Sequence, residues 1–231
     1  METNIKPGKH HLTQTIIRFP EISLRVRDGH KLRGYFGNLF KDHSPLLHNH
    51  FEDGSPVYQY PLVQYKVIDN IPHLVGFQEG SQLLIDLFLK IRELDIEGRI
   101  YPVFSKNIEN RSIIFDNFDT LKPYRFKTLW LGLNQKNFQT YRNLHNEEDK
   151  KKFLNRMLRN NILSFYKGIG FWTENKILVT ADLLPKTAKF KGNKLLGFTG
   201  KFVTNAPLPE LAGIGKSVAR GFGTVVTNQR L

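Results

Sequence analysis

The order of strand-like and helix-like segments limits the possible folds of this chain more than any other feature. We predict strands where apolar residues alternate and helices where they recur at three and four positions. The expected strands are residues 11–19, 57–68, 71–77, 99–104 and 112–115, and the expected helices are residues 30–40 and 79–92. The resulting order, β-α-β-β-α-β, is typical of a ferredoxin-like fold built on a split βαβ unit.

The second half of the chain follows the same order less regularly. Asn146 has the character of a helix N-cap, because three acidic residues follow it. The expected elements are a strand at 124–133, a helix from 146 to about 165, strands at 176–182 and 195–203, and a short strand at 224–227. A glycine-rich segment takes the place of the second helix. We therefore predict an α+β protein of two tandem ferredoxin-like (βαββαβ, RRM-like) units, with residues 1–118 as the N-terminal unit and 119–231 as the C-terminal unit.

Positive charge is concentrated in the second of these units. The chain of 231 residues has a net charge of +13. Residues 1–120 contain 14 basic and 15 acidic side chains, whereas residues 121–231 contain 20 and 6. A field of one sign on one half of a protein indicates a polyanionic partner, for which RNA or DNA is the best candidate. An anionic membrane surface and a basic charge kept only for solubility are the alternatives.

The composition excludes several classes of protein. The chain has no cysteine, which rules out disulfide scaffolds, zinc fingers, thiol nucleophiles and iron–sulfur clusters. Its longest apolar runs fall short of the ~20 residues that a membrane span requires. Residues 1–9 are not followed by the apolar core of a signal peptide. We therefore expect a cytoplasmic protein with no membrane partner.

The glycine-rich segment at 213–223 reads GIGKSVARGFG. Its Gly215-Lys216-Ser217 is not part of a nucleotide phosphate loop, because Glu210 stands where that motif requires a glycine. Missing Cβ atoms let backbone N–H groups approach a phosphate, and cations add charge-assisted contacts. The RNA-binding residues predicted here are Gly213, Gly215, Lys216, Arg220, Gly221 and Gly223. A mobile loop without ligand is the alternative.

A second basic feature lies on the predicted helix after Asn146. Lys152, Arg156 and Arg159 fall on one face of this helix, opposite an apolar face. Such a stripe is often only a solvated surface. In a half of the chain with this excess of positive charge, we predict that it contacts the RNA backbone.

The glycine-rich segment resembles the C-terminal glycine-rich loop of the RAMP superfamily, the CRISPR-associated RNA-binding proteins. Two further stretches support the resemblance, namely LLHNH at 46–50 followed by YQYPLVQYK at 58–66, and KLRGY at 31–35. Within the superfamily, the chain resembles the CRISPR repeat-processing endoribonucleases, especially the subtype-b branch. Residues 105–200 match only in length and pattern.

The resemblance implies cleavage of a precursor RNA within its CRISPR repeats. In this family a ribose 2′-OH attacks the adjacent phosphate without a metal, leaving a 2′,3′-cyclic phosphate and a 5′-OH. The reaction needs a base for the 2′-OH proton, an acid for the leaving oxygen, and cations or N–H donors for the phosphate charge. Histidine suits both proton transfers because its unperturbed pKa is ~6.5.

His48 and His50 meet this requirement, since they are two positions apart and would point the same way in an extended chain. A His-x-His pair at this place is catalytic in the family branch that the chain resembles. The resemblance assigns an assisting tyrosine to Tyr58 or Tyr60 and an assisting lysine to Lys41. Further candidates are His43, which could replace one histidine of the pair, and Lys31, which could replace Lys41.

Two other interpretations remain open at this point. The histidines together with Asp42, Glu52 or Asp53 could hold a metal, which would make the protein a metal-dependent nuclease. Alternatively, the chain is a non-catalytic RAMP-type RNA-binding subunit of a CRISPR effector complex. Our expectation is an endoribonuclease with no metal and no cofactor. Its expected partner is CRISPR repeat RNA, with other CRISPR-associated proteins as further candidates, and it would be a monomer or a homodimer.

Overall fold

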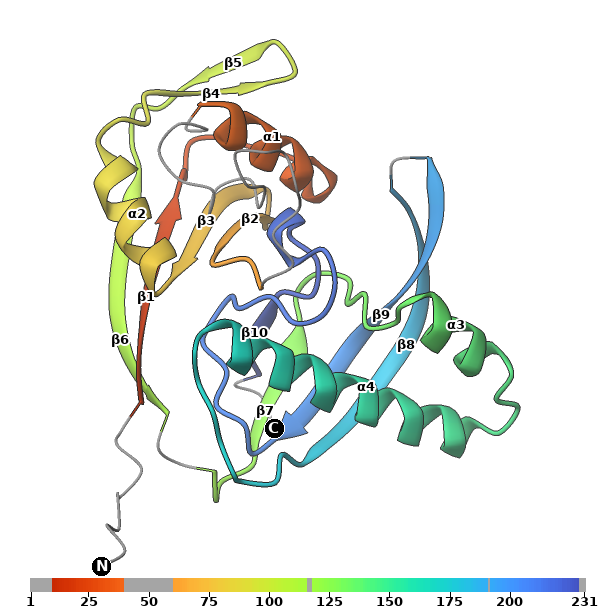
Figure 1. The fold of residues 1–231 in the computed structure, drawn as a ribbon. Helices are drawn as coiled ribbons and strands as arrows, with labels where there is room; N and C mark the ends of the chain where they lie inside the picture. The colour runs from red at the N-terminus through yellow and green to blue at the C-terminus, as the bar shows by residue number, and fades with distance from the viewer. Residues whose placement is uncertain (1–9, 40–59, 116–117, 191, 229–231) are drawn as a thin grey trace, which may run out of the picture.

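The computed structural model describes residues 10–39, 60–115, 118–190 and 192–228. Two units, each built on a four-stranded sheet, lie against one another, and a separate two-stranded hairpin stands at the far end of the first unit (Figure 1). Each sheet places its first and third strands at the centre and its second and fourth at the edges, which is the ferredoxin-like order. The predicted fold class is therefore confirmed.

The N-terminal unit contains a sheet in the order β2-β3-β1-β6, in which all neighbours are antiparallel. Its elements are β1 (His10–Arg18), α1 (Gly29–Leu39), β2 (Val63–Ile68), β3 (Ile71–Phe77), α2 (Glu79–Phe88) and β6 (Asn107–Phe115), with a 3-10 turn η1 (Val26–Asp28) before α1. Asp69 and Asn70 form the turn between β2 and β3 with positive φ angles of 50° and 66°.

Residues 93–102 depart from the prediction. The helix expected to reach residue 92 ends at Phe88, and β4 (Glu93–Ile96) and β5 (Arg99–Pro102) pair only with each other. The turn between them forms because Glu97 and Gly98 adopt positive φ and the Gly98 N–H donates to Asp95 Oδ1 at 2.7 Å. The segment expected as a strand at 99–104 thus belongs to a hairpin of its own, and β6 completes the main sheet.

Both faces of the N-terminal sheet are buried. On one face Val63, Tyr65 and Val67 pack with Leu32 of α1 and Leu84 of α2. The other face packs on the second unit, so that Phe77 of β3 meets Phe165 with ring centroids 5.8 Å apart. The two units consequently share one apolar core at this face, and the face under α1 and α2 has a separate core of its own.

The C-terminal unit contains a sheet in the order β10-β7-β9-β8, covered on one face by a long helix. Its elements are β7 (Lys122–Phe126), α3 (Gln135–Arg142), α4 (Glu147–Gly168), β8 (Val179–Phe190), β9 (Asn193–Thr204), a 3-10 turn η3 (Val218–Arg220) and β10 (Val225–Thr227). Asn146 caps α4 as predicted, since its Oδ1 accepts from the Glu148 N–H at 2.8 Å. Helix α3 was not expected.

Three strands of this unit differ in length from the prediction. The strand expected at 124–133 ends at Phe126, and Trp130 makes only an isolated bridge to Phe198. Strands β8 and β9 are longer than expected and form a hairpin that projects beyond the sheet (Figure 1). No helix within the described residues is long and apolar enough to cross a membrane.

Candidate nucleic-acid interface

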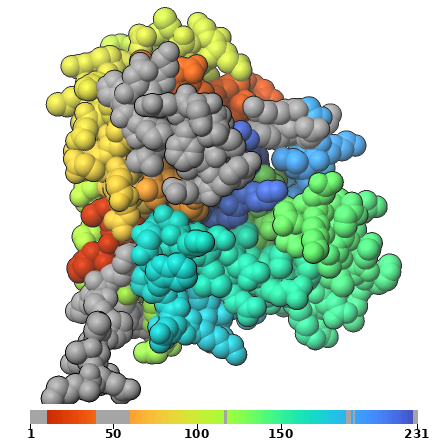
Figure 2. Space-filling view, viewed as in Figure 1, coloured from red at the N-terminus to blue at the C-terminus, as the bar shows by residue number. Residues whose placement is uncertain are grey.

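The glycine-rich segment lies between the two units and makes hydrogen bonds to residues of both. It reaches the surface between the N-terminal unit and α4, coloured blue in Figure 2. Ile214 is fully buried and Val218 nearly so. The segment is therefore a packed part of the core, which argues against the alternative of a mobile loop.

The backbone of this segment is largely committed to internal hydrogen bonds. The Ile214 N–H donates to Gly223 O at 2.8 Å, the Lys216 N–H to Leu131 O at 2.9 Å, and the Gly223 N–H to Leu129 O at 2.9 Å. These N–H groups cannot also cradle a phosphate. Contact with RNA through this segment would therefore come mainly from side chains.

At two positions of the segment, the structure explains why the residue is glycine. Gly223 has a φ of +63°, and a Cβ there would collide with the carbonyl oxygen of Ile214. Gly215 has a φ of +101°, and a Cβ there would lie 2.8 Å from Trp130 Nε1. Glycine at both positions is required by close packing, whatever the segment binds.

Tyr60 joins the glycine-rich segment to the chain that leads out of the predicted catalytic stretch. Its hydroxyl donates to Gly213 O at 2.6 Å and accepts from Gln64 Nε2 at 2.6 Å. Burial raises the pKa of this phenol far above its ordinary value. The phenol therefore stays protonated, and these contacts give Tyr60 a positioning role; its assistance in catalysis stays a prediction.

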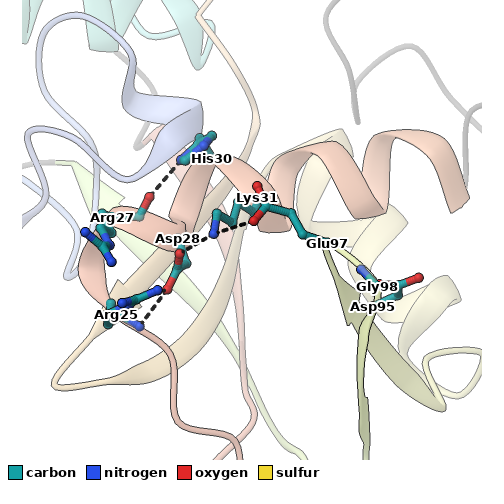
Figure 3. Close-up of polar contacts among 8 residues, drawn as sticks. All are labelled: Arg25, Arg27, Asp28, His30, Lys31, Asp95, Glu97 and Gly98. Atoms are coloured by element: carbon teal, nitrogen blue, oxygen red, sulfur yellow. Dashed lines mark hydrogen bonds and ion pairs between the residues drawn. The ribbon is translucent and has the colours of Figure 1, made fainter. Parts of the chain in front are cut away.

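The other predicted catalytic residues, Lys41, His43, His48, His50 and Tyr58, lie outside the described residues, so their roles stay predictions. The alternative lysine, Lys31, is described (Figure 3). Its ammonium lies 2.8 Å from Glu97 Oε2 and 2.9 Å from Asp28 Oδ1, and these partners raise its pKa. Lys31 thus fixes α1 to the β4–β5 turn, which weakens it as a candidate for the reaction.

A buried lysine makes a second connection between the units and was missed by the sequence reasoning. Lys66 of β2 is fully buried, and its Nζ donates to Thr224 Oγ1 at 3.1 Å. Burial lowers its pKa to about 7. The Thr224 hydroxyl in turn donates to Gly221 O at 3.1 Å, so Lys66 supports the end of the glycine-rich segment.

Two arginines from distant parts of the chain come together beside this segment. Burial lowers the pKa of the Arg33 guanidinium, and the positive charge of Arg220 lowers it further. The start of α1 lies directly against the segment, since a Cβ on Gly29 would be 3.0 Å from Arg220 O. Two neighbouring cations of this kind favour an anionic ligand, because it would relieve their mutual repulsion.

A basic cleft of about 440 Å³ opens next to Arg220. Its lining residues come from η1 of the N-terminal unit, and from residues 127–129 after β7, the β8–β9 hairpin and the glycine-rich segment of the C-terminal unit. Its cationic lining residues are Arg27, Lys127, Lys186 and Arg220, and none of the lining residues is acidic. Lys127 also pairs with Asp69 at 2.7 Å outside the lining. The cleft therefore offers an anion several positive charges drawn from both units.

The basic face of α4 is not part of this cleft. Helix α4 covers the face of the C-terminal sheet that carries Ala181, and Asn155 Oδ1 accepts from the Ala181 N–H at 2.9 Å. Lys186 is an odd number of positions from Ala181 along β8, so it belongs to the opposite face. Lys152, Arg156 and Arg159 are therefore separated from the cleft by the helix and the sheet. RNA contact by these three residues stays a prediction.

The described residues contain no group of three or more His, Asp or Glu side chains that could hold a metal. The histidines of the metal-site alternative lie outside those residues.

Comparison with known proteins gives similarity along nearly the whole chain. The family model of the Cas6b N-terminal domain matches residues 10–114, and that of the Cas6b C-terminal domain matches residues 117–228. An uncharacterized protein of Methanocaldococcus jannaschii is 36% identical over 144 residues, which cover 61% of this chain and 96% of that protein.

Two solved structures are similar in both sequence and fold. A crystal structure of Cas6b is 38% identical, covers 95% of this chain and 100% of its own, and has a TM-score of 0.89. A crystal structure of the CRISPR RNA processing endoribonuclease Cas6b is 35% identical with the same coverage and a TM-score of 0.77.

Proposed function

The chain belongs to the Cas6b family, and on that premise we propose that it is an endoribonuclease that cuts precursor CRISPR RNA within the repeats. A ribose 2′-OH attacks the adjacent phosphate, leaving a 2′,3′-cyclic phosphate and a 5′-OH, and no metal takes part. The N-terminal unit, residues 1–118, carries the cutting histidines. The C-terminal unit, residues 119–231, holds the RNA with its basic surface and the glycine-rich segment.

The observation that carries the proposal is the link at Tyr60. The His48-x-His50 stretch precedes Tyr60 closely in sequence, and the Tyr60 hydroxyl donates to the Gly213 carbonyl. The same glycine-rich segment supplies Arg220 to the basic cleft. The chain that carries the histidines is thus tied to the segment that carries the cations.

The chemistry follows from these two sets of residues. One histidine of the pair takes the 2′-OH proton, and the other protonates the leaving 5′ oxygen. The developing charge on the phosphate is stabilised by cations, for which Lys41 and Arg220 are the candidates. Since both proton transfers use imidazole, the cleavage rate should pass through a maximum near neutral pH.

The test uses purified protein, a labelled RNA containing one repeat of its own CRISPR locus, and excess EDTA. A matched RNA carries a single 2′-deoxy substitution at the cut site. One cut in EDTA that the substitution abolishes supports internal 2′-OH attack. Cleavage that requires added Mg²⁺ or Mn²⁺ would overturn metal independence, and tight binding without any cut would favour the non-catalytic subunit.

A further inference from the structure

The basic cleft has an apolar lining as well as a cationic rim. Val26, Leu129, Ala188 and Phe222 contribute apolar side chains to it, next to the four cationic residues described above. Val26 is 57% exposed. Apolar surface therefore remains accessible at the place where positive charge gathers.

This combination distinguishes between two forms of RNA. A double-stranded A-form helix presents phosphates and 2′-hydroxyl groups, which a flat basic surface can hold. An unpaired nucleotide also presents the face of its base, which stacks on aromatic side chains. A recess with an aromatic side chain and a cationic rim matches the unpaired nucleotide better.

The size of the cleft fits the same ligand. A volume of about 440 Å³ lies toward the lower end of the roughly 300–1,000 Å³ that small-molecule sites enclose. That space accommodates one base with its ribose but not a base pair with its two backbones. Arg27 from the N-terminal unit and Arg220 from the glycine-rich segment both line the cleft, so the phosphates next to the base would meet cations from both units.

We propose that this cleft is a pocket for one unpaired base of the RNA, with Phe222 as its stacking surface and Arg27, Lys186 and Arg220 holding the flanking phosphates. The inference rests on the proposed function, because it takes the RNA substrate from there. It adds a position in the RNA at which the base must be present and unpaired.

The experiment is an abasic scan combined with substitution of Phe222. The probe is the repeat RNA, made non-cleavable by the 2′-deoxy substitution if the protein cuts it and used unmodified if it does not. Each nucleotide is replaced in turn by an abasic one, and the dissociation constant is measured for the wild type and for Phe222→Leu. Phe222→Tyr keeps an aromatic ring, and Trp172→Leu removes an exposed aromatic side chain that does not line the cleft.

The wild type should lose about tenfold in affinity when one particular base is removed, as expected for one stacked base. Phe222→Leu should bind the intact RNA about tenfold more weakly than the wild type does. Removing the same base from the RNA should then lower the affinity of this variant little further. Phe222→Tyr should restore the wild-type pattern, and Trp172→Leu should leave it unchanged. Val26→Asn, at an exposed position, should reduce the loss of affinity caused by removing that base, without disturbing the core.

An equal abasic loss in wild type and Phe222→Leu would overturn the inference. So would unchanged affinity of Phe222→Leu for the intact RNA. Thermal unfolding of each variant is measured in parallel, and Val26→Asn replaces Phe222→Leu if the latter is unfolded. If the protein cuts the repeat but neither Phe222→Leu nor Val26→Asn changes the loss of affinity at any abasic position, the pocket is overturned and the proposed function is not. If the protein shows the expected loss at one position but cuts nothing, the proposed catalysis is overturned and the pocket is supported.

Discussion

The two units share one strand order but fill the position of the second helix differently. In the N-terminal unit α2 occupies it and buries Leu84 and Leu87 on the sheet. In the C-terminal unit the glycine-rich segment occupies it, packs on both units, and presents Arg220 to the basic cleft. A helix satisfies its own backbone groups, whereas an irregular segment needs partners nearby. The same position in the fold can therefore serve packing alone, or it can also join two units and bring positive charges together.

The largest expected effect tests whether cutting belongs to the N-terminal unit. His50→Ala should lower the cleavage rate by about 100-fold or more, as loss of a general acid or base does. RNA affinity should change by less than about threefold, since the imidazole serves proton transfer more than binding. Single-turnover cleavage and filter binding measure the two quantities. His145→Ala, at an exposed position in the C-terminal unit, is the matched control, and an unaltered rate for His50→Ala would remove that residue from the reaction.

The next effect tests whether the glycine-rich segment is indispensable for packing. Gly223→Ala should reduce the free energy of unfolding by about 2–4 kcal/mol, because it adds strain at positive φ and a clash with Ile214 O. Gly34→Ala in α1 is the control, since nothing lies within 4 Å of the added Cβ. That change should be neutral or stabilise by up to about 1 kcal/mol. Denaturant unfolding measures both, and equal stabilities of the two variants would contradict this account of the segment.

A third prediction compares the glycine-rich segment with the basic face of α4. Lys216→Ala combined with Arg220→Ala should weaken RNA binding about tenfold and reduce the slope of log affinity against log salt by about 0.7 for each lost phosphate contact. The matched variant neutralises Lys152 and Arg156 on α4, where Lys152 already pairs with Glu148 at 2.7 Å. We expect a smaller change there. A larger loss from the α4 variant would move the principal RNA surface to the other face of the C-terminal sheet.

The smallest effect concerns the lysine between the units. Burial lowers the pKa of Lys66 from 10.5 to about 7. Between these two values the unfolded chain holds a proton that the folded protein has released, so stability should rise with pH over this window. The expected slope is at most about 1.4 kcal/mol per pH unit. Lys66→Met should flatten this dependence in unfolding experiments between about pH 7 and about pH 9. A wild type and variant with parallel pH dependence would mean that Lys66 is charged in the folded protein.

The sequence pattern predicted the helices and strands correctly wherever the periodicity of apolar residues was strong. Strands β1 and β3 and helices α1 and α4 lie within a few residues of their expected positions. The β4–β5 hairpin was missed because Glu93, Asp95 and Glu97 gave it the composition of a loop. Its Leu94 and Ile96 are nevertheless buried, and tertiary packing outweighed local composition there.

Less of the candidate site than of the fold could be predicted from the sequence pattern. Gln64 and Lys66 alternate with apolar residues along β2, a pattern typical of a strand with one solvated face. Both are fully buried, because the second unit covers that face. The glycine-rich segment was found by its composition, yet the sequence did not reveal that its N–H groups bond internally. Most of these features depend on contacts between residues far apart in the sequence, such as Lys66 with Thr224 and Gly223 with Leu129, which periodicity does not encode.

The shared core also constrains when this protein becomes competent during its synthesis. Phe77 of β3 needs Phe165 of α4, and Lys66 of β2 needs Thr224 near the last strand. A nascent chain that has only reached β6 therefore exposes one apolar face of a finished sheet. Domains usually fold in order as the ribosome releases them, but here the first unit can bury that face only once the second unit has been made. The basic cleft can form only after Phe222, its last lining residue, has been made, so a truncated translation product would expose apolar surface and lack the cleft.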